Sequence, residues 1–271
     1  MQKISKFSLD GRVAIVTGVM GNLGPVWAEA LLEAGASVVG FDLQTEDTDS
    51  LIAQLGGMFS GRFAIRHADV RSRKELQAVL AWCREKFGPP SILVNNAGID
   101  QPPGGLSTSY DMTTVPFEVC ETIFGVNSIG AFQCAQVFGE SMIESGGGSI
   151  INIGSMYGMI SPDSRMYDHI EVDPPFLKPP AYGASKAAVV NFSRYLASHW
   201  APHGVRVNTL SPGGILGGQD EAFKSKFCAR VPMGRMGNAE ELKGPLVFLA
   251  SDASSYVTGT EILVDGGYTC W

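Results

Sequence analysis

Short runs rich in valine, isoleucine and leucine recur along the chain and alternate with longer segments of helical periodicity. The apolar runs predict seven strands, at 12–18, 37–42, 62–70, 91–98, 149–155, 205–213 and 261–267. Helices are predicted near 23–34, 72–87, 116–145, 181–202 and 238–251. Strands that are apolar on both faces and joined by helices are typical of a parallel sheet with helices on either side. Since no Pro- or Ser-rich linker divides the chain, we expect a single doubly wound α/β domain over residues 1–271.

Three long irregular segments interrupt this alternation, at 98–116, 168–186 and 213–237. Each of them follows the carboxyl end of a predicted strand. In an open parallel sheet that edge is where ligands bind. We therefore expect the three segments to surround one site.

The first predicted strand ends in a glycine-rich turn that leads into a helix. Gly18, Gly21 and Gly24 have the spacing G-x-x-G-x-x-G. Such a turn lets the backbone approach a pyrophosphate closely, and the free N–H groups of the following helix can bind it. The turn therefore predicts a dinucleotide cofactor, with an unliganded glycine-rich turn as the alternative.

Asp42 at the end of the second predicted strand bears on which dinucleotide is bound. An acid there can accept hydrogen bonds from the adenosine ribose hydroxyls and would repel a 2′-phosphate. No Lys or Arg occurs between Val13 and Ala53 to neutralise such a phosphate. These features favour NAD over NADP, unless Asp42 is only a solvated acid at a strand end.

The stretch "YGASK" contains a candidate pair for proton transfer. Tyr182 and Lys186 are four residues apart and therefore share one face of a predicted helix. A phenol with a pKa of about 10 is a poor base at neutral pH, and a nearby ammonium lowers that pKa. Ser155, at the end of the fifth predicted strand, can orient and polarise a substrate oxygen.

Four motifs in a fixed order give the chain a recognisable pattern: "TGVMGNLG", "NNAG", "YGASK" and "SPGGI". Together they resemble the short-chain dehydrogenase/reductase family, and the resemblance extends from "LDGRVAIVTG" to "GTEILVDGG". It implies a Rossmann-type fold with a seven-stranded parallel sheet. It also implies reversible hydride transfer between a nicotinamide and an alcohol or carbonyl, carried out by a homotetramer or homodimer.

The resemblance also assigns roles to individual residues. The implied catalytic residues are Asn127, Ser155, Tyr182 and Lys186. The implied cofactor-binding residues are Gly18, Gly21, Asn22, Leu23, Gly24, Asp42, Asp69, Val70, Asn95, Ala97, Gly98, Tyr182, Lys186, Pro212, Gly213 and Ile215. Within these sets, Asp69 and Val70 would meet the adenine, and Ile215 would offer its backbone to the carboxamide. Asn127 would bend its helix and hold a water leading to Lys186, or else be an ordinary buried hydrogen-bonding residue.

Two positions depart from the family pattern. Asn22 stands where the family more commonly has a glycine, and Gly21 precedes it, as in the family's extended members. Gly217 stands where the family often has a threonine that helps to hold the carboxamide. We expect a rearranged pyrophosphate contact, and either a looser grip on the nicotinamide or a grip that relies on the following loop.

An insert at about 160–180 separates the two parts of the candidate catalytic site, so that Tyr182 follows Ser155 by 27 residues. Its polar side chains include Asp163, Arg165, Tyr167, Asp168, His169, Glu171 and Lys178. We predict that the insert walls the substrate pocket and selects a polar, hydroxyl-rich or anionic substrate, as in similar members acting on sugars or sugar-derived acids. The alternative is a surface or subunit-contact loop. Lys224, Lys226 and Arg230 either help to bind an acidic substrate or form the solvated face of a short lid.

Composition narrows the partners and the compartment. The net charge of −7 argues against nucleic acid and leaves a small-molecule substrate. Five scattered cysteines without a CxxC pattern fit reduced thiols in the cytoplasm. The first residues contain no apolar core of a secretion signal, and no apolar run reaches the roughly 20 residues that span a bilayer. The four histidines show no metal-ligand spacing, so no metal is expected.

The sequence thus predicts an NAD-dependent oxidoreductase that interconverts a secondary alcohol and a ketone on a polar small molecule. Two other functions remain open. The glycine spacing also suits a sugar epimerase or dehydratase that uses NAD transiently, although the 271 residues leave little room for the usual substrate domain. A non-catalytic dinucleotide-sensing protein would not need Ser155, Tyr182 and Lys186.

Overall fold

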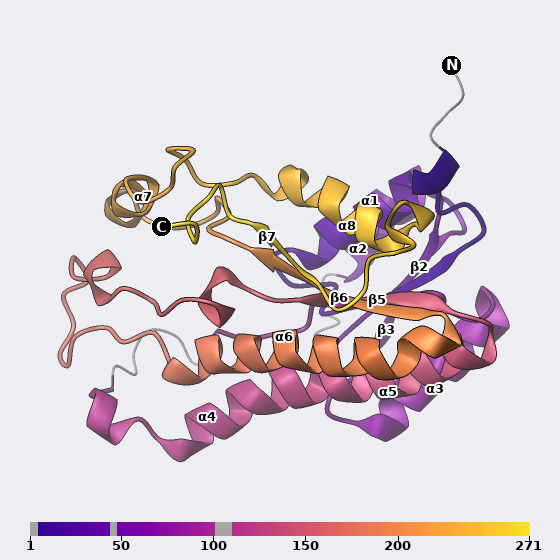
Figure 1. The fold of residues 1–271 in the computed structure, drawn as a ribbon, viewed down its shortest axis with the longest axis horizontal. Coiled ribbons are helices and arrows are strands. Elements are labelled where there is room, and N and C mark those ends of the chain that lie inside the picture. Colours follow the sequence, from indigo (N-terminus) through magenta and orange to yellow (C-terminus); the bar gives the residue numbers. More distant parts are fainter. Residues whose placement is uncertain (1–4, 44–47, 101–109) are drawn as a thin grey trace.

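The computed structural model describes residues 5–43, 48–100 and 110–271. Seven strands form one parallel sheet in the order β3-β2-β1-β4-β5-β6-β7 (Figure 1). Their bounds are β1 (Val13–Thr17), β2 (Ser37–Asp42), β3 (Phe63–His67), β4 (Ile92–Asn95), β5 (Gly148–Ile153), β6 (Val205–Pro212) and β7 (Glu261–Val264). The predicted α/β fold with a seven-stranded parallel sheet is confirmed. The strand order reverses between β1 and β4, which opens a crevice at their carboxyl ends.

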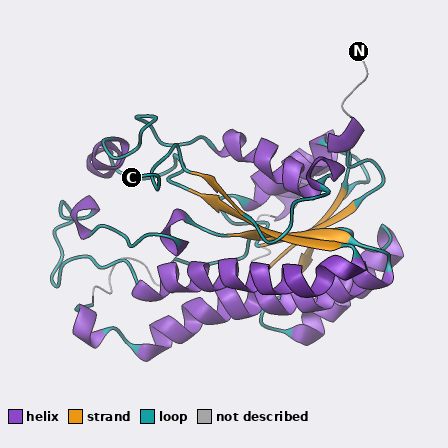
Figure 2. Cartoon of the chain, viewed as in Figure 1, coloured by secondary structure: helices purple, strands orange, loops and turns teal. Residues whose placement is uncertain are grey.

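Helices cover both faces of the sheet (Figure 2). One layer contains α1 (Gly24–Glu33), α2 (Thr48–Met58) and α8 (Lys243–Ala250). The other contains α3 (Arg73–Lys86), α4 (Phe117–Phe124), α5 (Ala131–Glu144) and α6 (Pro180–Trp200). A further helix, α7 (Glu221–Cys228), lies beside the C-terminus and away from both layers (Figure 1). In the described part of the chain, no helix has both the length and the apolarity to cross a membrane.

The side chains of β1 explain why the strands were recognisable. All five residues of this strand are buried. Ala14 and Val16 pack among residues of α1, α2 and α8, whereas Val13 and Ile15 pack among residues of α3, α5 and α6. Because successive side chains point to opposite faces, a strand between two helix layers must be apolar throughout.

The structure corrects several predicted boundaries. The strand predicted at 62–70 ends at His67, and those predicted at 91–98 and 261–267 end at Asn95 and Val264. The helix predicted over 116–145 is interrupted by a π-helical segment, Gly125–Gly130, between α4 and α5. The helix predicted over 238–251 begins with a 3-10 turn, Ala239–Leu242, before α8.

Two helices were not predicted. One is α2, and the other is α7, which lies inside the segment predicted to be irregular at 213–237. α7 begins after Asp220, whose carboxylate accepts a hydrogen bond from the N–H of Phe223 at 2.8 Å. α4 and α8 also have eight residues, but they adjoin other helical turns, whereas α7 stands alone and is too short to display a clear helical period.

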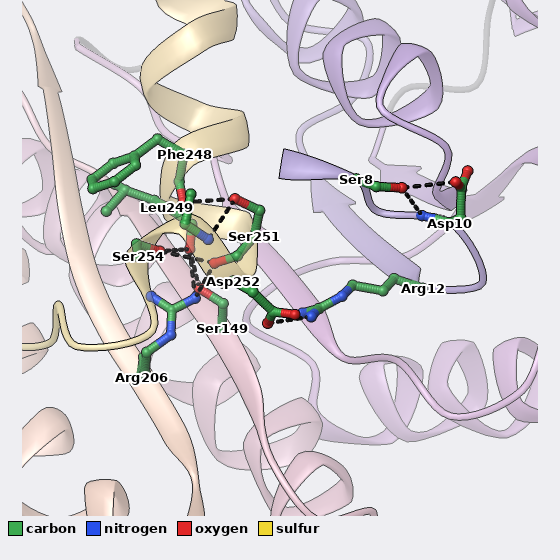
Figure 3. Close-up of polar contacts among 11 residues, drawn as sticks. Ser8, Asp10, Arg12, Ser149, Arg206, Phe248, Leu249, Ser251, Asp252 and Ser254 are labelled. Carbon is green, nitrogen blue, oxygen red and sulfur yellow. Dashed lines mark hydrogen bonds and ion pairs between the residues drawn. The ribbon is translucent and has the colours of Figure 1, made fainter. Parts of the chain in front are cut away.

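At the amino-terminal edge of the sheet, polar side chains fasten the end of α8 to two strands (Figure 3). The carbonyl of Leu249 accepts hydrogen bonds from Ser149 Oγ at 2.7 Å and from Arg206 Nη2 at 2.8 Å. Ser254 Oγ donates to the same carbonyl at 3.1 Å. Ser149 and Arg206 lie near the starts of β5 and β6, so this network is at the opposite edge of the sheet from the irregular segments.

Candidate active site

A cavity of about 1190 Å³ opens along the carboxyl edge of the sheet. It is larger than the roughly 300–1,000 Å³ of common small-molecule sites and has room for a dinucleotide together with a substrate. It is bordered by most of the predicted site residues, namely Gly18, Gly21, Asn22, Leu23, Asp42, Asp69, Val70, Ala97, Gly98, Ser155, Tyr182, Lys186, Pro212, Gly213 and Ile215. Gly24, Asn95 and Asn127 lie behind its wall.

The glycine turn is held in a conformation that larger residues would disturb. Gly18 has a φ of +64°, and a Cβ there would lie 2.7 Å from Cα of Ala97. A Cβ on Gly24 would lie 2.4 Å from the carbonyl oxygen of Gly18, so this glycine lets α1 begin against the turn. Leu23 at the N-cap of α1 makes no side-chain hydrogen bond to the helix. The turn therefore presents its backbone and the start of α1 to the cavity, which suits a pyrophosphate.

Asp42 connects the end of β2 to the same turn. Its Oδ2 accepts a hydrogen bond from the N–H of Met20 at 2.9 Å. Farther along this edge, the carboxylate of Asp69 binds the guanidinium of Arg71 at 2.7 and 3.0 Å. Those bonds hold the pKa of Asp69 below its ordinary value. The positive charge of Arg71 in the cavity wall is thus already matched by the carboxylate of Asp69.

The two asparagines of "NNAG" face different ways. Asn95 is buried and donates to Asn152 Oδ1 at 2.7 Å and to the Ala131 carbonyl at 3.1 Å. Asn96 Nδ2 donates to the Gly18 carbonyl at 2.9 Å, and its Oδ1 accepts from Trp27 Nε1 at 2.7 Å. The sequence analysis placed Asn95 among the cofactor-binding residues and missed Asn96, which borders the cavity and supports the glycine turn. Because successive side chains along a strand point to opposite faces, the sequence could have indicated that Asn95 and Asn96 have different surroundings.

Three catalytic candidates meet on the cavity wall. α6 begins at Pro180, so Tyr182 and Lys186 lie one turn apart near its start. Lys186 is buried, and its Nζ donates to the Ile153 carbonyl at 2.8 Å. The same Nζ lies 6.0 Å from the centre of the Tyr182 ring. Ser155 follows β5 and accepts a hydrogen bond from the N–H of Tyr157 at 3.2 Å.

The electrostatics of this cluster differ from the sequence prediction. Burial lowers the pKa of Lys186 to about 8. Burial also raises the pKa of Tyr182, and this outweighs the hydrogen bond with Ser155 and the nearby ammonium of Lys178, which both lower it. We predicted that Lys186 would lower the pKa of Tyr182. Among the chain's own groups, the cation with that effect is instead Lys178, whose Nζ lies 5.1 Å from the ring centre.

Asn127 lies in the π-helical segment and ties it to two other parts of the fold. Its Oδ1 accepts from the Ile99 N–H at 2.8 Å. Its Nδ2 donates to the Ile99 carbonyl at 2.9 Å and to Ser185 Oγ at 3.0 Å. Asn127 therefore joins the interrupted helix to the segment after β4 and to α6, at the residue that precedes Lys186. A role in holding a water for Lys186 stays a prediction.

The segment after β6 is organised by Gln219, which sequence reasoning missed. Its Nε2 donates to the Ile215 carbonyl at 2.9 Å, and its Oε1 accepts from the Gly217 N–H at 2.8 Å. Gly217 is the position where the family often has threonine. One amide side chain thus bridges the two residues that were expected to lie near the carboxamide.

The insert lines the cavity with Tyr167, Ile170, Phe176 and Lys178. The Tyr167 ring packs against Phe176, with ring centres 4.9 Å apart, and against Phe223 of α7, with centres 5.5 Å apart. The insert and α7 therefore form one wall of the cavity.

Ion pairs join the insert to α7 and to the residues that flank this helix. Lys226 pairs with Asp168, and Arg230 pairs with Asp163, while His169 Nε2 lies 3.0 Å from Asp220. Lys224 pairs with Glu221 at 2.8 Å. The three cations considered for an acidic substrate are therefore all paired with carboxylates of the chain. The described residues also contain no cluster of three or more His, Cys, Asp or Glu able to hold a metal.

Comparison with known proteins agrees with the resemblance to the short-chain dehydrogenase/reductase family. Residues 18–269 match a family model described as enoyl-(acyl carrier protein) reductase. Galactitol 2-dehydrogenase of Rhizobium johnstonii is 36% identical, and the match covers 98% of each chain. The structure of a short-chain type dehydrogenase/reductase from Mycobacterium marinum is similar over all of both chains, with a TM-score of 0.85 and 33% identity. A gluconate 5-dehydrogenase from Burkholderia cenocepacia, solved with NADP and tartrate, has a TM-score of 0.82 and 31% identity over 98% of each chain. The chain belongs to the short-chain dehydrogenase/reductase family and is an oxidoreductase of CH–OH groups.

Proposed function

We propose that this enzyme is an NAD-dependent dehydrogenase that interconverts a secondary alcohol and a ketone on a polyol-like small molecule. The observation that carries the proposal is the grouping of Ser155, Tyr182 and Lys186 on the wall of a cavity that also contains the glycine turn and Asp42. The similar proteins named for galactitol and gluconate support a hydroxyl-rich substrate.

The chain's residues divide the work of alcohol oxidation between them. Ser155 binds the substrate hydroxyl and orients it toward Tyr182. Tyr182, as phenolate, accepts the hydroxyl proton, and in the reverse direction the phenol returns that proton to the alkoxide. A bound nicotinamide supplies the acceptor for the hydride that leaves the same carbon. Lys186, fixed on the Ile153 carbonyl, holds its positive charge next to the tyrosine ring.

The fit to a dinucleotide rests on the glycine turn and on Asp42. Gly18 and Gly24 keep the turn free of side chains where a pyrophosphate would approach. The carboxylate of Asp42 would repel the extra phosphate of NADP, and Arg71 is already bonded to Asp69. We expect Asp42→Ser to reduce the ratio of kcat/KM with NAD to kcat/KM with NADP at least tenfold, about 1.4 kcal/mol. A preference for NADP in the unaltered enzyme would contradict this choice of cofactor.

A panel of polyols, sugars and hydroxy acids with NAD or NADP, followed at the NADH absorbance band, tests the activity. We expect NADH to accumulate in step with ketone, whereas an epimerase or dehydratase would give no net redox change. Tyr182→Phe should lower kcat by about 10²–10⁴-fold. Tyr256→Phe, at a fully exposed tyrosine outside the cavity, is the matched control and should keep full activity. If Tyr182→Phe retained near wild-type turnover, the assigned proton transfer would be wrong.

We also propose that the enzyme is a homo-oligomer. Phe117 of α4, Ile129 of the π-helical segment and Tyr195 of α6 are 71%, 50% and 59% exposed, and all belong to one helix layer. Exposed large apolar side chains are stabilised when a subunit interface covers them, which favours association. Sedimentation equilibrium distinguishes a dimer or tetramer from a monomer, and a monomer at micromolar concentration would contradict the proposal.

The cytoplasm is the compartment that we propose. All five cysteines are unpaired, and burial raises the pKa of Cys83 to about 12. Unpaired cysteines persist most readily in a reducing compartment. Fractionation of the producing cells tests this placement.

A further inference from the structure

An ion pair borders the cavity close to the catalytic Tyr182. Lys178 Nζ lies 3.0 Å from Asp100 Oδ2. Lys178 belongs to the insert and lies just before α6, whereas Asp100 belongs to the segment after β4. The lysine side chain is only 16% exposed, while that of the aspartate is 58% exposed. The ammonium is therefore held inside the cavity and its partner lies toward the opening.

The position of Lys178 relative to the catalytic tyrosine places it next to a bound substrate. Its Nζ lies 5.1 Å from the ring centre of Tyr182 and 6.0 Å from that of Tyr157. Ser155, Tyr182, Lys178 and Asp100 all border the same cavity. A substrate whose reacting hydroxyl is bound by Ser155 and Tyr182 thus has its neighbouring groups within reach of the ammonium.

The other charges on the cavity wall have different partners. Among the described residues that border the cavity, the Lys and Arg residues are Arg71, Lys178 and Lys186. Arg71 is bonded to Asp69, and Lys186 to the Ile153 carbonyl. Lys178 is therefore the cation that meets the substrate away from the reacting hydroxyl. The described carboxylates that border the cavity are those of Asp42, Asp69, Asp100 and Asp220.

The chemistry of this pair suits hydroxyl groups better than a carboxylate. An ammonium donates three hydrogen bonds, and an ionised carboxylate only accepts them. A hydroxyl both donates and accepts, so it can bind to both partners without separating them. A carboxylate can bind only to Lys178, and it would have to displace Asp100 or remain beside its negative charge.

We propose that Lys178 and Asp100 together bind a hydroxyl next to the reacting carbon, and that their cancelling charges make the enzyme select uncharged polyols over sugar acids. This inference rests on the proposed function and narrows its substrate class. It makes Lys178 and Asp100 specificity-determining residues. It also gives the insert a chemical task, because the insert supplies the lysine.

A matched pair of substrates, galactitol and galactonate, tests the selection. We expect wild-type enzyme to have the higher kcat/KM for galactitol. Asp100→Asn removes the negative charge and keeps the size of the side chain, which leaves the ammonium free for an acid. The ratio of kcat/KM for galactonate to that for galactitol should then rise at least tenfold. Asp168→Asn, another exposed aspartate paired with a lysine but outside the cavity, is the control and should leave the ratio unchanged.

Lys178→Gln provides the second arm of the test. It should raise KM for galactitol several-fold. It should not raise the ratio of kcat/KM for galactonate to that for galactitol, because no ammonium remains to bind the acid. Adding Lys178→Gln to Asp100→Asn should abolish the gain for galactonate. This dependence on Lys178 separates a direct charge effect from a general loss of structure. Thermal melting of each variant establishes that it is folded.

The failures of the two proposals differ. If wild-type enzyme oxidises no member of the panel with either cofactor, the proposed function is wrong and this inference falls with it. If wild-type enzyme oxidises galactitol but prefers galactonate, only the selection proposed here is overturned. The same holds if folded Asp100→Asn leaves the ratio unchanged, or if Asp168→Asn shifts it equally.

Discussion

At the scale of single residues, the two lysines near the catalytic tyrosine differ in what burial does to their charge. Lys186 is buried, and burial lowers its pKa to about 8, so that its charge is costly to maintain. Lys178 keeps its charge beside Asp100, and its ammonium lowers the pKa of Tyr182. Burial nevertheless leaves the pKa of Tyr182 above its ordinary value. The structure therefore favours a protonated tyrosine at neutral pH and alcohol oxidation at alkaline pH.

The pH dependence of oxidation tests the role of Lys178. Because the phenolate of Tyr182 accepts the proton, kcat for oxidation should rise with pH. Lys178→Gln removes a positive charge that stabilises the phenolate, so the rising limb should move to higher pH. Arg165→Gln, at an exposed cation of the same insert, should leave the limb in place. Profiles of kcat from pH 7 to 10.5 check this, and a shift to lower pH for Lys178→Gln would contradict it.

Lys186 should make stability depend on pH in a definite direction. Its pKa is about 8 in the folded chain, against 10.5 for a lysine that is not buried, as in the unfolded chain. Between these values the unfolded chain binds more protons at this site, so its contribution to the free energy of unfolding rises with pH. Relative to Lys186→Met, wild-type enzyme should gain up to about 3 kcal/mol as the pH increases through this window. Urea denaturation of both proteins at pH 7.5 and 10 measures the difference, and a constant difference would exclude the expected linkage.

At the scale of elements, the sequence predicted those whose local pattern matches their burial. β1 was recognisable because helices cover both of its faces and all five residues are apolar or buried. α7 is an isolated helix of eight residues, held by the cap at Asp220 and by its contacts with the insert, so its own periodicity was too weak to predict it. The π-helical segment lies where the family resemblance implied a bend at Asn127. The apolar pattern did not indicate it, because its turn depends on bonds from Asn127 to residues 28 and 58 positions away.

The candidate site likewise contains residues that the sequence identified and residues that it did not. The order of motifs was sufficient to identify Ser155, Tyr182 and Lys186 as candidates, and the fold brings them to one wall. Asp100 and Lys178 are 78 positions apart, and their pairing depends on the path of the insert. The charged residues of the insert gave no sign of which one enters the cavity and which ones pair with α7.

Asn127 should stabilise the π-helical segment. Asn127→Ala leaves the N–H and carbonyl of Ile99 without their side-chain partner and should lower the free energy of unfolding by about 2–4 kcal/mol. Ser185→Ala removes one of the three bonds, together with the bond from Ser185 Oγ to the Tyr182 carbonyl within α6, and should cost about 1 kcal/mol. Urea denaturation measures the free energy of unfolding of both variants and shows which one is less stable. Equal stability of Asn127→Ala and wild type would mean that the segment is held by packing alone.

At the scale of the whole molecule, the two edges of the sheet have separate tasks. The carboxyl edge carries the cavity, the insert and α7. The amino edge carries the network around the Leu249 carbonyl, which fastens α8 to β5 and β6 (Figure 3). Since the strands run between these edges, a change confined to the amino edge should alter stability without altering the chemistry.

Substitution of Arg206 tests whether the amino edge of the sheet affects stability without affecting catalysis. Its guanidinium donates to the carbonyls of Leu249 at 2.8 Å and of Ser251 and Val257 at 3.2 Å. Arg206→Met should lower the free energy of unfolding by about 2–4 kcal/mol, because it leaves these carbonyls without a charged donor. The value of kcat/KM at a temperature well below the melting range should not change. Arg12→Met removes a pair with Asp252, whose side chain is 68% exposed, and should cost less than about 1 kcal/mol. A loss of kcat/KM in folded Arg206→Met would mean that the amino edge influences catalysis through the strands.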